Sequence, residues 1–151
     1  MNTPRSASLD INHILQVLPY RHPMLLVDRV TEIVPSQYIR GHKNVSHSEP
    51  WFQGASRPML PGMLVLEALS QIGGILAYAS EPFDPSSNFI YFLGLERVKF
   101  RKPVVPGDRL DLFCEVMHHG MNVWKIRGEA SVEGALCASG ELLASVVDRA
   151  P

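Results

Sequence analysis

Apolar and polar residues alternate with a period of two along several segments of the chain. Every second residue is apolar over residues 109–118, and residues 123–132 repeat the pattern with charged and polar residues opposite. Such alternation predicts antiparallel strands with one face in a core and the other in water. Segments rich in β-branched and aromatic residues predict further strands at residues 24–34, 38–45, 88–102 and 135–147. We therefore expect an antiparallel sheet of five or six strands.

Two segments have the pattern of helices. Asp10 is a good N-cap for a short helix over residues 11–18, which Pro19 ends. A longer helix begins at Gly62, ends near Ser80 and is apolar nearly all round, so it has to be enclosed by other elements. It carries polar residues and falls short of the ~20 apolar residues that span a membrane. The sequence predicts an α+β fold in which one long central helix is wrapped by the sheet, without membrane insertion.

The composition is that of a globular protein and excludes some classes of partner. The chain has 151 residues, 46% hydrophobic and 19% charged, with a net charge of -1, which is typical of one globular domain over residues 1–151 and gives no reason to expect nucleic acid as a partner. Residues 1–9 have no apolar run, so we expect a flexible start rather than a signal peptide. Cys114 and Cys137 lie in apolar strands and have no metal-ligand spacing. We expect buried free thiols, a cytoplasmic protein, and neither metal nor cofactor.

Glu67 is the residue that does not fit a purely structural helix, because aliphatic residues flank it on both sides. A carboxylate in apolar surroundings either has a raised pKa or finds hydrogen-bond donors, and both are common in active sites. Gln71 lies one helical turn later and can hold that carboxyl group. The free N–H groups after Pro61 and Gly62 form a site for developing negative charge. A structural carboxylate that pairs with an arginine or with backbone amides is the alternative.

Five segments, in this order and spacing, are similar to one enzyme family: Leu18–Val30, Lys43–Ser46, Glu49–Gly54, Arg57–Gln71 and Phe100–Asp108. The chain resembles the β-hydroxyacyl-acyl carrier protein dehydratases of bacterial fatty acid synthesis. The resemblance implies the hot-dog fold and a (3R)-hydroxyacyl substrate that becomes a trans-2-enoyl thioester. It also implies an acyl carrier protein with a phosphopantetheine-linked chain as partner. The expected assembly is a homodimer with two active sites at the subunit interface, or a hexamer built as a trimer of dimers.

The same resemblance assigns roles to single residues. Glu67 matches the catalytic glutamate, and Gly62 matches the glycine whose N–H holds the thioester carbonyl. An apolar substrate tunnel is expected beside the helix, with these further binding residues: Met63, Leu66, Gln71, Phe92 and Leu93. A basic face is expected on one strand because Val98 and Phe100 should point inward, and it is either a solvated strand face or a carrier-protein patch formed by Arg97, Lys99, Arg101 and Lys102.

The catalytic histidine of the family has no counterpart in the matching loop. The family has His-Phe-Pro after Phe-x-Gly, whereas Gly54 is followed here by Ala55–Pro58, in a loop two residues shorter. No side chain in this loop titrates near neutral pH. His47, a few residues upstream, is the first candidate for a replacement base, ahead of His22 and His42.

Three functional hypotheses follow. The first is a dehydratase with impaired or altered catalysis. The second is a hot-dog acyl thioesterase that uses Glu67 as base or nucleophile and the Gly62 end of the helix as oxyanion site. The third is a non-catalytic acyl-binding subunit that pairs with an intact homologue and contributes Glu67 to it.

Overall fold

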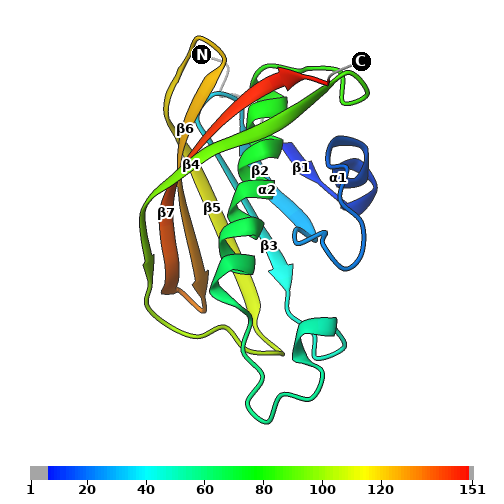
Figure 1. Cartoon of the computed structure of the whole chain (residues 1–151), viewed down its shortest axis with the longest axis vertical. Coiled ribbons are helices and arrows are strands. Elements are labelled where there is room, and N and C mark those ends of the chain that lie inside the picture. Colours follow the sequence, from blue (N-terminus) through cyan, green and yellow to red (C-terminus); the bar gives the residue numbers. More distant parts are fainter. Residues whose placement is uncertain (1–6, 150–151) are drawn as a thin grey trace.

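The computed structural model describes residues 7–149. Their elements are, in chain order, β1 (Ala7–Leu9), α1 (Ile11–Val17), β2 (Arg29–Val34), β3 (Tyr38–Asn44), the 3₁₀ helix η1 (Pro50–Phe52), α2 (Gly62–Ser80), β4 (Asn88–Phe100), β5 (Arg109–Gly120), β6 (Val123–Val132) and β7 (Ala135–Asp148). All the strands belong to one antiparallel sheet in the order β1-β2-β3-β5-β6-β7-β4. α2 lies along one face of this sheet, as Figure 1 shows, so the predicted arrangement of one helix wrapped by a sheet is confirmed.

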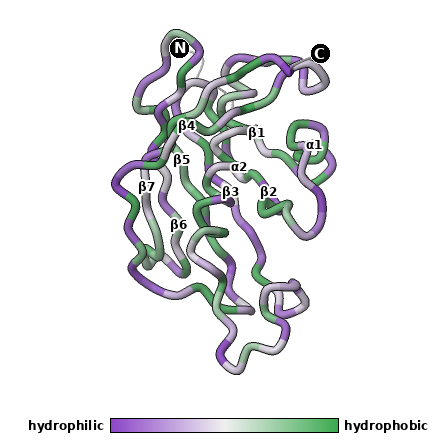
Figure 2. Tube along the Cα trace, viewed as in Figure 1, coloured by the Kyte–Doolittle hydropathy of each residue, from purple (hydrophilic) through white to green (hydrophobic). Residues whose placement is uncertain are grey.

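The period-two pattern places the core as expected. Leu110, Leu112 and Cys114 of β5 are buried, and so are Trp124 and Ile126 of β6. Hydrophobic and hydrophilic positions follow one another along these strands in Figure 2. Burial of the apolar face contributes roughly 25 cal/mol for each Å² removed from water, which is the main force that holds the sheet on α2.

The central helix is enclosed along most of its length. Its buried residues run from Val65 to Ala77, apart from Glu67. Gly128 of β6 lets the sheet approach, since a Cβ there would lie 3.2 Å from Leu69 Cδ1. By length and hydropathy α2 could cross a membrane, but 67% of its most apolar window is buried within this fold. It is a core helix.

Three details correct the sequence-based prediction. The sheet has seven strands rather than five or six, because Ala7–Leu9 pairs with β2 instead of being part of a flexible start; residues 1–6 lie outside the described residues. The strand expected from residue 24 begins only at Arg29, because the backbone before it bonds to the side chain of Gln71. Phe100 does not point inward, since β4 is irregular between Glu96 and Lys99, and its side chain is 55% exposed.

Candidate active site

Glu67 lies on the second turn of α2 and is half-buried. Its Oε1 accepts a hydrogen bond of 3.0 Å from Nε2 of Gln71, one turn later on the same helix face. The spacing of four residues is what brings the two side chains together. Gln71 donates the hydrogen bond that the structure gives this carboxyl group, so Oε2 is left for another donor.

The side-chain amide of Gln71 is 2% exposed, and both its nitrogen and its oxygen are hydrogen-bonded. Its Oε1 accepts from the N–H of Leu26 at 2.8 Å, and its Nε2 also donates to the carbonyl oxygen of Met24 at 2.7 Å. One amide therefore fixes Glu67 and also ties α2 to the segment that precedes β2. A buried amide with every bond made costs little, whereas one with a missing partner is destabilising.

The N-terminus of α2 is open at its first turn. Its N-cap is Pro61, which supplies no side-chain acceptor, so the first N–H groups of the helix are free of a capping side chain. Met63 is exposed here. A Cβ at Gly62 would lie 2.6 Å from Cε1 of Phe100. The packing of that ring is a structural reason for glycine at this position, in addition to the approach of a substrate carbonyl that the resemblance implies.

The loop that lacks the histidine is anchored at its beginning. Nζ of Lys43 lies 2.7 Å from Oε1 of Glu49, and these side chains are 6% and 12% exposed. Oε2 of Glu49 also accepts the N–H of Ser46 at 2.8 Å. Farther along, residues 53–57 are exposed. The contacts thus fix the start of the loop, whereas residues 53–57, where the family's imidazole is expected, lie in an exposed part.

Three histidines were candidates for the replacement base, and the structure gives the surroundings of each. His47, the candidate replacement base, is exposed and stacks on Phe52 with ring centroids 6.5 Å apart. His22 is exposed. Burial lowers the pKa of His42, and the charge of Arg109 lowers it further. None of these three forms a hydrogen bond with Glu67 among residues 7–149.

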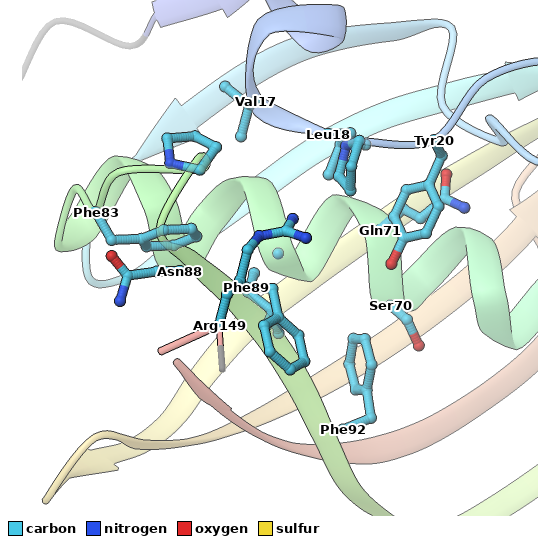
Figure 3. Close-up of a pocket in the computed structure, with 14 residues that line it drawn as sticks. Val17, Leu18, Tyr20, Ser70, Gln71, Phe83, Asn88, Phe89, Phe92 and Arg149 are labelled. Carbon is cyan, nitrogen blue, oxygen red and sulfur yellow. The ribbon is translucent and has the colours of Figure 1, made fainter. Parts of the chain in front are cut away.

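A cavity of about 380 Å³ lies between α2, β4 and the segment after α1. Figure 3 shows its lining, which includes Gln71 and Phe92 from the predicted binding residues. Leu66 and Leu93 are not part of this lining, so their place in a substrate tunnel stays a prediction. Leu66 is buried in the core, and Leu93 is 52% exposed because neighbouring residues on a strand point to opposite faces.

Sequence reasoning missed several lining residues, chief among them Tyr20, Ser70 and Arg149. Tyr20 lies within the first segment that resembles the family, and that was the signal available. A tyrosine between two prolines gives no indication of where its ring points, so only the folded chain brings it to α2.

The predicted basic residues are on the surface. Arg97, Lys99, Arg101 and Lys102 are all exposed. Arg97 is partly neutralised, because its Nη1 lies 3.0 Å from Oε1 of Glu141. Elsewhere, Cys114 and Cys137 are buried free thiols as expected. Residues 7–149 contain no group of three or more His, Cys, Asp or Glu side chains arranged to hold a metal ion.

Comparison with known proteins gives the family. Residues 18–141 match the FabA-like domain. The chain is 60% identical over 151 residues to the 3-hydroxyacyl-[acyl-carrier-protein] dehydratase FabZ of Sorangium cellulosum, with 99% of this chain and 97% of the relative covered. It is 52% identical over 143 residues to the FabZ of Myxococcus xanthus, with 93% and 94% covered.

Solved structures agree on the fold. A chain of the dehydratase heterocomplex ApeI:P from Xenorhabdus doucetiae superposes with a TM-score of 0.77 at 19% identity, over 90% of this chain and 91% of that one. A mutant thioesterase from Pseudomonas aeruginosa gives 0.69 at 15% identity, over 93% and 96%. A hot-dog-like protein from Thermanaerovibrio acidaminovorans gives 0.61 at 19% identity, over 77% and 84%. At these identities the likeness concerns the fold alone, and it confirms the hot-dog prediction.

Proposed function

Because the chain belongs to the FabA-like family of 3-hydroxyacyl-[acyl-carrier-protein] dehydratases, we propose that it is a hydro-lyase of fatty acid biosynthesis. It converts 3-hydroxyacyl thioesters to trans-2-enoyl thioesters. The observation that carries this proposal is the carboxyl group of Glu67, held at 3.0 Å by Gln71 on the apolar central helix. Carboxyl groups held in place on an apolar helix are frequent at active sites.

The reaction requires one group to take a proton from C2 and another to protonate the departing 3-hydroxyl. The family resemblance gives one of these tasks to a histidine, and Ala55 follows Gly54 where that histidine is expected. A general acid–base group contributes about 10² to 10⁴ in rate. We therefore propose that turnover is lower than that of a histidine-containing relative by about 10² or more.

The substrate chain is proposed to arrive on an acyl carrier protein. The exposed cationic face formed by Arg97, Lys99, Arg101 and Lys102 supports this, because carrier proteins of this kind are acidic and electrostatic complementarity speeds and orients encounter. The ion pair with Glu141 reduces the positive charge that Arg97 offers to a carrier protein. We expect a cytoplasmic enzyme.

A homodimer is proposed to complete the site. β4 is an edge strand of the sheet, and Tyr91, Leu93 and Leu95 expose large apolar side chains along it. Such an edge invites pairing with a second strand. Two copies that pair through β4 would form one larger sheet and join a site from two halves, and three such dimers would give the hexamer that the resemblance implies.

A non-catalytic partner subunit is the second candidate, because the loop after Gly54 lacks the histidine while the β4 edge is open. Mass spectrometry of 3-hydroxyacyl and saturated acyl carrier proteins after incubation with the chain separates the possibilities. Loss of water from the hydroxyacyl form supports the dehydratase. Cleavage of the saturated thioester indicates a thioesterase, and no reaction without an added intact homologue indicates the partner subunit.

A further inference from the structure

Tyr20 lies where the described cavity meets the helix that carries Glu67. The residue belongs to the segment between α1 and β2 and is half-buried. Figure 3 shows its ring beside the side chain of Gln71, with the hydroxyl directed toward the side of the cavity where Ser70 and Phe92 lie. Gln71 in turn holds Glu67. Tyr20 and Gln71 therefore line the same part of the cavity, and Gln71 connects this part to the carboxyl group of Glu67, which lies outside the lining.

The segment around Tyr20 is fixed from both sides. On one side the Arg21 guanidinium donates to the carbonyl oxygens of Leu18 at 2.9 Å and Tyr20 at 2.7 Å. On the other side Gln71 bonds to the backbone of Met24 and Leu26. These contacts hold the backbone on both sides of Tyr20 without a regular element, and a group that is positioned before the substrate binds reduces the entropy cost of the reaction.

The Tyr20 hydroxyl has the chemistry of a proton donor. Burial raises the pKa of Tyr20, and the negative charge of Glu67 raises it further. The phenol therefore keeps its proton at neutral pH and is a donor rather than a base. Oε1 of Glu67 accepts the hydrogen bond from Gln71, and Oε2 is the oxygen that can take up a proton. The two groups are suited to opposite halves of one elimination.

We propose that Tyr20 is the proton donor to the departing 3-hydroxyl and that Glu67, in the absence of the family's imidazole, acts as the base. This deepens the proposed function and rests on it. Oε2 of Glu67 takes the C2 proton, the C2–H electrons form the C2–C3 double bond, and the C3–O bond breaks as the phenol proton joins the hydroxyl to give water. The proton on Glu67 then returns to the tyrosinate, so both groups are restored.

Other hydroxyls and imidazoles are less suited to this task. The Ser70 hydroxyl lines the cavity, but it donates to the carbonyl oxygen of Leu66 at 2.9 Å within its own helix. His47 and His22 are exposed and are not in the lining. Tyr20 is the one lining residue, among the described part of the chain, with a titratable O–H beside Gln71.

The test is the substitution Tyr20→Phe, which keeps the ring and removes the hydroxyl. Steady-state dehydration of a 3-hydroxyacyl carrier protein is measured for wild type, Tyr20→Phe and the control Tyr78→Phe, a half-buried tyrosine of α2 outside the lining. We expect kcat to fall about 10²-fold in Tyr20→Phe with KM nearly unchanged, and wild-type values in Tyr78→Phe. Replacing Tyr20 by a more acidic fluorotyrosine should change kcat, which a purely structural ring would not do.

Each outcome of these measurements either supports or overturns the role of Tyr20. Equal kcat for wild type and Tyr20→Phe overturns the role of Tyr20 and leaves the dehydratase proposal intact. If wild type is inactive and a variant with the family's His-Phe-Pro loop after Gly54 is active, the family reaction stands and the role of Tyr20 is again overturned. If neither dehydrates the substrate, the proposed function itself fails, and the role of Tyr20 with it.

Discussion

A single amide joins α2 to the segment before β2. The side chain of Gln71 bonds to the backbone of Met24 and Leu26 as well as to Glu67. Its replacement therefore changes the orientation of the carboxyl group and leaves buried backbone groups without partners at the same time.

Gln71→Leu should lower the free energy of unfolding by at least about 2 kcal/mol, because each buried polar group left without a partner costs about 1–3 kcal/mol. Urea denaturation followed by far-UV circular dichroism measures this. Gln16→Leu is the control, since Gln16 is an exposed helical glutamine. Equal unfolding midpoints for the two variants would contradict the role given to Gln71.

At this scale the sequence indicated part of the site. Glu67 and Gln71 were predicted as a pair because four residues separate them on a helix. The bonds from Gln71 to Met24 and Leu26 were not, because they join positions far apart along the chain and leave no periodic pattern. The position of Tyr20 beside α2 was not predicted either, because Tyr20 and α2 are also far apart along the chain.

A nearly buried ion pair between Lys43 and Glu49 connects β3 to the loop before α2. Lys43→Ala should destabilise the fold by about 3 kcal/mol, because removing one member leaves an uncompensated charge. Thermal and urea unfolding check this. Arg109→Ala, which breaks the exposed pair with Asp111, should cost less than about 1 kcal/mol. Similar losses in both variants would show that burial does not distinguish these pairs.

A second group of ion pairs connects β4, β6 and β7 through the carboxyl group of Glu141. A hydrogen bond from Lys125 lowers the pKa of this carboxyl group below its ordinary 4.5, and the Arg97 guanidinium contributes further. A depressed pKa stabilises the fold at neutral pH, and this stability is lost as the pH falls below 4.5 and through the folded-state pKa. Glu141→Gln should therefore unfold at lower urea concentration than wild type at pH 7 and approach it near pH 3. Glu133→Gln, in an exposed turn, is the control; parallel pH curves for wild type and Glu141→Gln would contradict the assignment.

Strands with clean alternation, such as β6, were predicted from the sequence with their full bounds. The sequence-based prediction was wrong where features other than the period-two pattern determine the structure. β4 is irregular between Glu96 and Lys99, with Arg97 at a φ of 51°, and this reverses the expected direction of Phe100. β1 is too short for a period to be read, and its pairing with β2 joins residues more than 20 positions apart, such as Ala7 with Ile33.

For the molecule as a whole, the open edge at β4 predicts a dimer. Leu93→Lys should convert it to monomers, because a charge in a paired apolar edge is costly to bury. Light scattering at micromolar concentration measures the mass. Met121→Lys, at a hairpin tip where the side chain is 98% exposed, should leave the assembly unchanged. A wild-type monomer would contradict the proposed dimer.

We propose that this chain is a dehydratase that works through Glu67 without the family's histidine. The most direct test is the rate of water loss from a 3-hydroxyacyl carrier protein, measured for wild type, Glu67→Gln and a variant in which the longer His-Phe-Pro loop replaces Ala55–Pro58. We predict slow turnover in wild type, none in Glu67→Gln, and a rate higher by about 10² or more in the loop variant. A Glu67→Gln enzyme as fast as wild type, or a wild type already as fast as the loop variant, would contradict it.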